Sequence, residues 1–184
     1  MNLSDYITTL SLFHGTSRTN GIKIMREGFQ TGEKYNWEIK SKKNYVYLSW
    51  AYAPFFAMAV KPNPSEKLAL IKIEIDMDDA YPDDDFLMLS LGKPRYTQAD
   101  LDKVRLSDYK YLAINSFKYL GNVAVRPETA NKGIKGVRYF NGRGLVMKVD
   151  PTITPINFSF LGNWYHDLTE FIYEGGDFND FESY

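Results

Sequence analysis

Two short stretches, Leu12-Phe13-His14-Gly15-Thr16-Ser17 and Tyr45-Val46-Tyr47-Leu48-Ser49, are the most informative part of the sequence. Each stretch is typical of a buried strand that ends in polar groups. Between them, Ile22, Met25 and Phe29 fall at helical spacing, and a polar loop follows from Thr31 to Asn44. A His and a Tyr on neighbouring strands predict a nucleotide-binding surface.

The order of these elements carries more information than either stretch alone. A strand closes on His14-Gly15-Thr16, a helix follows from Asn20 to Glu27, Gly28 stops it, and a second strand carries Tyr47. This arrangement resembles the opening of the ADP-ribosyltransferases. The resemblance implies that His14 and Thr16 hold the nicotinamide side of NAD and that the Tyr47 ring stacks on the nicotinamide.

The resemblance also implies a function and a set of ligand-binding residues. We expect a mono-ADP-ribosyltransferase, in the glycosyltransferase class, that uses NAD as a substrate and needs no metal. It would transfer ADP-ribose to a protein or nucleic-acid acceptor and release nicotinamide. The residues expected to bind NAD are His14, Gly15, Thr16, Tyr47 and Ser49.

Further along the chain, Leu68 to Asp76 alternates as a strand, Ser107 to Tyr119 has a helical pattern, and Asn122 to Val125 is a second strand. The resemblance therefore covers residues 10–150 of a single domain spanning residues 1–184. It implies an α+β fold, a split β-sheet sandwich with flanking helices.

In the His-Tyr-Glu branch of the family, the third motif opens a strand with a catalytic Glu. Asn122 occupies that place here, so Tyr47 and Asn122 are the expected catalytic residues. An amide can orient the ribose hydroxyl, but it has no useful basicity near neutral pH. Asn122 could still suffice for transfer if the acceptor is already nucleophilic and Glu128 or an acid from residues 76–85 assists the reaction.

Composition narrows the classes of partner and site. The chain has 22 basic and 23 acidic residues, so its net charge is −1. This charge produces no overall electrostatic attraction to nucleic acid or to an anionic membrane. The chain has no cysteine and two histidines, His14 and His166, too few for a zinc site of the usual ligand types. No long apolar run or signal-like terminus is present, which predicts a cytoplasmic protein.

Three other segments have simpler interpretations. Asp83, Asp84 and Asp85 are expected to form a solvated turn, and Gly92 to Asp108 a charged connection. Residues 157–184 form an acidic, aromatic C-terminal extension without Lys or Arg. This extension could dock on the basic strands of its own domain, cover a cleft, or bind a partner.

Two alternative functions remain open. Without the Glu, the domain could be a catalytically inactive nucleotide-binding or inhibitory interaction protein, such as a phage or toxin-system factor. The RNA 2′-phosphotransferases share the scaffold and a His-Gly-Thr segment, and Arg18 and Arg26 follow His14 here. Tyr47 and Asn122 occupy the places of other members of their Arg-His-Arg-Arg set, so this function ranks third.

Overall fold

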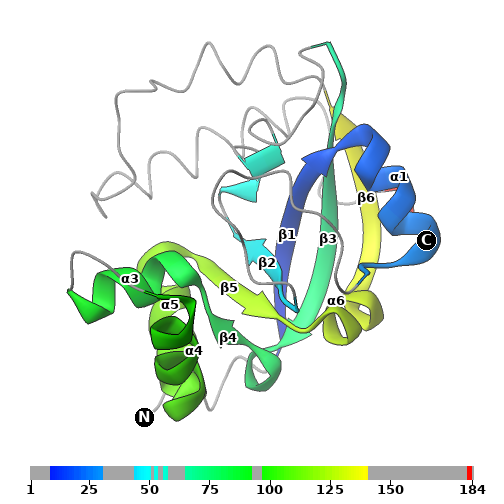
Figure 1. The fold of residues 1–184 in the computed structure, drawn as a ribbon. Coiled ribbons are helices and arrows are strands. Elements are labelled where there is room, and N and C mark those ends of the chain that lie inside the picture. The colour runs from blue at the N-terminus through cyan, green and yellow to red at the C-terminus, as the bar shows by residue number, and fades with distance from the viewer. Residues whose placement is uncertain are drawn as a thin grey trace.

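The computed structural model describes residues 9–30, 44–50, 52–53, 56–57, 65–92, 97–140 and 182–183 (Figure 1). Within these ranges, the strands form one seven-stranded sheet in the order β4-β5-β2-β1-β3-β6-β7. Every neighbouring pair is antiparallel. Helices flank this antiparallel sheet, which agrees with the expected α+β class. No helix in the described ranges has the length and apolar character needed to cross a membrane.

The longest pairing in the sheet joins its two central strands. β1 (Thr9–Ser17) lies along the whole of β3 (Leu68–Asp76), and β6 (Ile134–Phe140) continues the sheet beyond β3. The alternating apolar residues of β1 and β3 produce this half, because a strand buried on one face needs a period of two. The strand predicted at 68–76 is confirmed.

The other half of the sheet contains three short strands. β2 (Val46–Ser49) pairs with β5 (Asn122–Val125), and β5 pairs with β4 (Tyr81–Pro82). The two halves meet where Phe13 of β1 lies opposite Ser49 of β2. Phe13 and Ser49 are the one register pair between these halves among the described residues.

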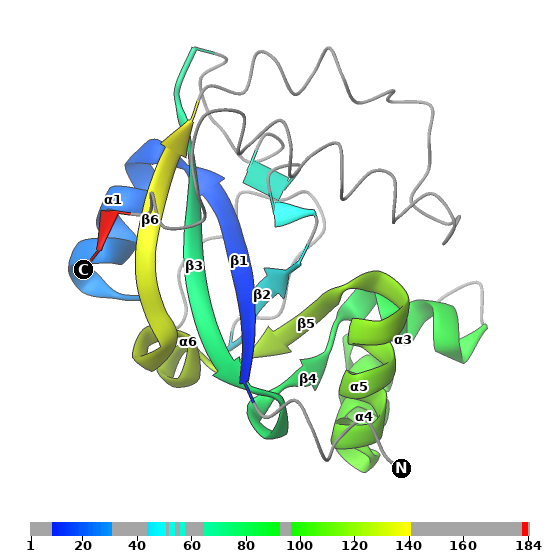
Figure 2. The same ribbon diagram turned by 180° about the vertical axis from the view of Figure 1, so that it is seen from behind.

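One face of the sheet forms the main hydrophobic core. Leu12, Leu48, Ile71 and Val123 are almost completely buried there. Helix α1 (Arg18–Glu27) covers part of this face; the Ser17 side chain caps its start and Gly28, with φ 75°, ends it. Both views place α1 beside β3 and β6 (Figures 1 and 2).

A helical group lies at the other end of the sheet, next to β4 and β5 (Figures 1 and 2). It comprises α3 (Asp84–Leu91), α4 (Gln98–Ser107) and α5 (Tyr109–Leu120), and a 3-10 turn, η2 (Met77–Asp79), precedes β4. The expectation of a connection at 92–108 is wrong for its second half. A capping box between Thr97 and Asp100 starts α4 there.

The segment after β5 contains Glu128, one of the residues considered for assisting the acceptor. Glu128 lies in the first turn of helix α6 (Pro127–Gly133), where it is exposed. Pro127 occupies the first turn of that helix, a position that needs no backbone N–H. A proline after a strand is therefore a helix start here.

The C-terminal extension contributes one described strand, β7 (Glu182–Ser183). Its residues lie opposite Val137 and Gly136 of β6. This pairing matches the first of the three roles considered for the extension, docking on the strands of its own domain. Residues 141–181, including His166, lie outside the described residues.

Gly15 allows the segment after β2 to approach β1 closely. A Cβ built at Gly15 would lie 1.7 Å from the backbone oxygen of Ala53. Gly15→Ala should therefore lower the free energy of unfolding by about 1–3 kcal/mol, toward the upper end because a backbone atom must move. Chemical denaturation measures this change.

The matched control is Gly92→Ala, where no atom of the described residues lies within 4 Å of the added Cβ. It adds only the strain of a left-handed backbone, φ 59°, which costs about 1–2 kcal/mol. If the Gly15 variant were as stable as the wild type, the close approach to Ala53 would be refuted.

Candidate functional site

Three of the predicted site residues lie together on one face of the sheet. Ser49 of β2 lies opposite Asn122 of β5, and Tyr47 lies opposite Ala124. Because side chains two residues apart share a face, Tyr47, Ser49 and Asn122 all lie on the face opposite the main core. Asn122 is only 6% exposed, and its Oδ1 has no hydrogen-bond partner among the described residues.

Ser49 also holds the chain that leaves β2. Its Oγ accepts a hydrogen bond of 2.7 Å from the backbone N–H of Tyr52. The next residue, Trp50, donates its backbone N–H to the carbonyl of Gly121 at 2.8 Å. These bonds fix the end of β2 against the start of β5, and the Ser49 hydroxyl keeps its own proton for donation.

His14 lies on the core face instead. It pairs with Ile71 of β3, and its ring meets the Phe29 ring edge-on, with 5.0 Å between centroids. Its Nδ1–H donates to the backbone carbonyl of Tyr47 at 3.0 Å, because a carbonyl can only accept. Burial lowers the pKa of His14 and favours the neutral ring, whose Nε2 is then an acceptor.

Thr16 also lies on the core face. It pairs with Ala69, and its methyl group lies near the position where a Cβ on Gly21 of α1 would stand. The structure thus brings together Tyr47, Ser49 and Asn122, whereas the register directs the His14 and Thr16 side chains to the other face. β1 and β2 are neighbours as predicted, and His14 is positioned to tie them together. Contact of any of these residues with NAD stays a prediction.

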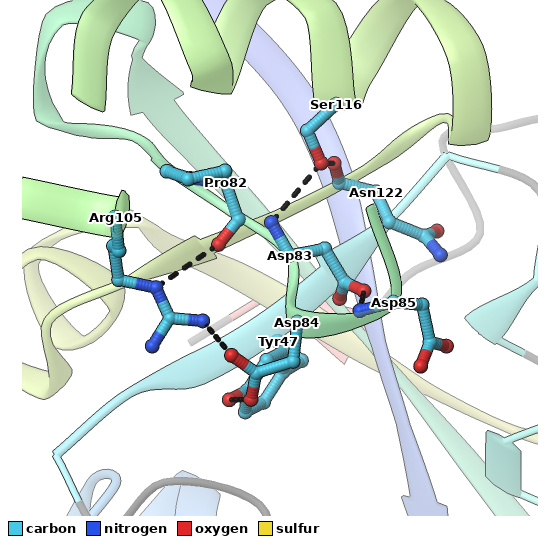
Figure 3. A network of polar contacts seen from close by, with 8 residues as sticks. All are labelled: Tyr47, Pro82, Asp83, Asp84, Asp85, Arg105, Ser116 and Asn122. Atoms are coloured by element: carbon cyan, nitrogen blue, oxygen red, sulfur yellow. Dashed lines mark hydrogen bonds and ion pairs between the residues drawn. The ribbon is translucent and has the colours of Figure 1, made fainter. Parts of the chain in front are cut away.

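A group of acidic residues borders Asn122 (Figure 3). The extended chain at Asp83 continues from Pro82, which lies opposite Val123, so Asp83 follows at the level of Asn122. The backbone N–H of Asp83 donates to Ser116 Oγ at 3.0 Å. The Ser116 hydroxyl in turn donates to the backbone carbonyl oxygen of Asn122 at 2.7 Å. One serine of α5 therefore joins the two segments.

Asp83 is buried, so the expected solvated turn is wrong at this position. It is 7% exposed, and its carboxylate caps α3 by accepting the N–H of Asp85 at 2.9 Å. Burial raises the pKa of Asp83 to about 7, with further increases from the charges of Asp85 and Asp84. The N–H of Asp85 and the charge of Arg105 act in the opposite direction. The result is a carboxyl group that titrates near neutral pH.

Asp84 connects Tyr47 to a buried cation. It accepts the Tyr47 hydroxyl and forms an ion pair with Arg105. The Arg105 side chain is fully buried, donates Nε to the Pro82 carbonyl at 3.3 Å, and lies over the Tyr45 ring at 4.6 Å. The phenol of Tyr47 is thereby tethered at a defined place.

Sequence reasoning named an acid from residues 76–85 as a possible assisting group, but it did not single out Asp83 or Asp84, and it did not identify Arg105. The first two had a usable signal, because an Asp before an apolar helical run is a typical N-cap. Arg105 had none: it lies on α4, and only the packing of α4 near α3 brings it to Asp84.

The site therefore consists of a tethered tyrosine, a buried amide with an unpaired oxygen, and a buried carboxyl group beside it. Within the described ranges, no group of three or more His, Asp or Glu side chains is arranged to hold a metal ion. Comparisons of the chain with protein-family models, curated proteins and solved structures found no match.

Proposed function

We propose that this protein is an NAD-dependent mono-ADP-ribosyltransferase whose site lies on the sheet face of Tyr47, Ser49 and Asn122. The observation that carries the proposal is the position of Asn122, which lies directly opposite Ser49 and whose buried Oδ1 has no hydrogen-bond partner within the described ranges. A buried polar atom without a partner costs stability and suggests a role in binding. This proposal includes the finer fold assignment, the split β-sheet sandwich of that family.

The residues have distinct roles in this proposal. The Tyr47 ring stacks on the nicotinamide while its hydroxyl stays bound to Asp84. The Asn122 amide orients a ribose hydroxyl, and Ser49 can donate a hydrogen bond beside it. A reaction with an oxocarbenium-like transition state depends mainly on such positioning. His14 acts through the backbone by holding β1 against Tyr47.

The amide of Asn122 supplies the main test. Asn122→Ala should reduce nicotinamide release by roughly 10- to 1000-fold, the range for losing one positioned hydrogen-bonding group. Calorimetry with NAD should show most of the affinity retained. Incubation with labelled NAD and separate protein, DNA and RNA pools identifies the acceptor.

Asn115→Ala on α5 is the matched control, and its activity should equal that of the wild type. Asn122→Glu restores the carboxylate expected from the family and should raise hydrolysis of NAD or transfer to weak acceptors. If both Asn122 variants bound and consumed NAD like the wild type, Asn122 would not belong to the site.

A second candidate is a nucleotide-binding protein without turnover. The absence of basicity in the Asn122 amide favours it. In that case NAD would bind to the wild-type protein, and no acceptor pool would lead to nicotinamide release.

A further inference from the structure

We propose that Asp83 is the catalytic base of this site and removes the proton from the acceptor. The inference rests on the proposed function and adds a residue to it. Asp83 lies between β4 and α3, and a base there would supply the basicity that the Asn122 amide lacks, without a carboxylate at position 122 itself.

The position of Asp83 is the first argument. Asp83 follows the β4 residue opposite Val123, so it stands at the level of Asn122, and Ser116 binds both backbones. In Figure 3, the Asn122 amide and the Asp85 carboxyl lie on the side of Asp83 that is away from Arg105. Among the described residues, the buried Oδ1 of Asn122 has no hydrogen-bond partner, so it is able to accept a hydrogen bond from a ligand.

The second argument is that helix capping alone does not need a carboxylate here. Asn, Ser or Thr caps a helix about as well. Asp83 is instead a buried acid next to Asp84 and Asp85, and the Arg105 guanidinium is bonded to Asp84 and Pro82 rather than to Asp83. Such an arrangement opposes ionisation and destabilises the charged form, which is typical of a functional acid or base.

The chemical step balances with these groups. The bond between the ribose anomeric carbon and the nicotinamide nitrogen breaks, and neutral nicotinamide leaves with the electron pair. An acceptor O–H or N–H forms the new bond to that carbon and passes its proton to the Asp83 carboxylate. The proton then goes to solvent, so Asp83 is regenerated.

The test compares Asp83→Asn with the wild type, using NAD and the acceptor pool that the wild type labels. Asparagine keeps the cap and the shape but cannot act as a base. At pH 7.5 we expect nicotinamide release to fall by about 100-fold or more. NAD affinity, measured by calorimetry, should change by less than about threefold. Asp108→Asn is the matched control, because Asp108 is exposed, does not cap α5 with its side chain and has no role in the proposed site, so this variant should keep full activity.

The wild-type pH profile gives a second readout that needs no variant. The rate should rise with pH up to about 7, where the pKa of Asp83 lies, and then level off. The residual activity of Asp83→Asn should not show this rise of the rate with pH. Unchanged activity and an unchanged profile in the variant would overturn the role of Asp83 and leave the transferase intact. Absence of NAD binding by the wild type at millimolar concentration would overturn both proposals.

Discussion

Asp84→Asn should lower the free energy of unfolding by about 3–5 kcal/mol at pH 7. The substitution keeps the shape of the side chain and an oxygen that accepts the Tyr47 hydroxyl, so it removes mainly the negative charge. Arg105, whose side chain has no exposed surface, then keeps a buried positive charge whose remaining partners, within the described part of the chain, are the Pro82 carbonyl and the Tyr45 ring. Urea denaturation with two probes measures the loss.

Asp78→Asn is the matched control for this prediction. Asp78 pairs with Lys110 at 3.0 Å, but both side chains are more than half exposed, at 76% and 54%. Surface pairs contribute about 0–1 kcal/mol, so this variant should remain close to the wild type. Equal small losses in the two variants would mean that water reaches Arg105.

Asp83→Asn should change the pH dependence of stability by roughly 4 kcal/mol. The pKa of Asp83 is raised from 3.8 to about 7 by folding. Because folding raises this pKa, the protonated Asp83 carboxyl contributes fully to the free energy of unfolding below about pH 4. This contribution is lost as the pH rises toward 7 and the carboxyl ionises in the buried site. The asparagine variant has no such loss, so it should gain stability relative to the wild type across this window.

Thermal and urea unfolding of both proteins at pH 4, 5.5 and 7.5 provides the measurement. The difference between variant and wild type should grow steadily from the lowest pH to the highest. A difference in stability that stayed constant with pH would show that Asp83 has an ordinary pKa. The argument that burial adjusts Asp83 to act as a base near neutral pH would then fail. A more stable but less active variant would show that this carboxylate is kept at a cost to the fold.

The strands and helices whose local sequence pattern agrees with their burial in the fold were predictable from the sequence. The strand at 68–76 and the strand at 122–125 have the predicted bounds, because alternating or continuous apolar residues need a buried sheet position. The helix after Ser17 follows from its spacing and from the stop at Gly28. The placement of Tyr47 next to the strand of His14 also followed from the order of the motifs.

The tertiary structure alone decided which side chains share a face and which charges meet. Strand register, which the sequence does not state, places Asn122 opposite Ser49 and sends His14 toward Phe29. The packing of α4 brings Arg105 to Asp84, and the burial of Asp83 follows from that assembly. A pKa depends on desolvation and neighbouring charges, so three adjacent aspartates look alike in the sequence and become different acids only in the fold.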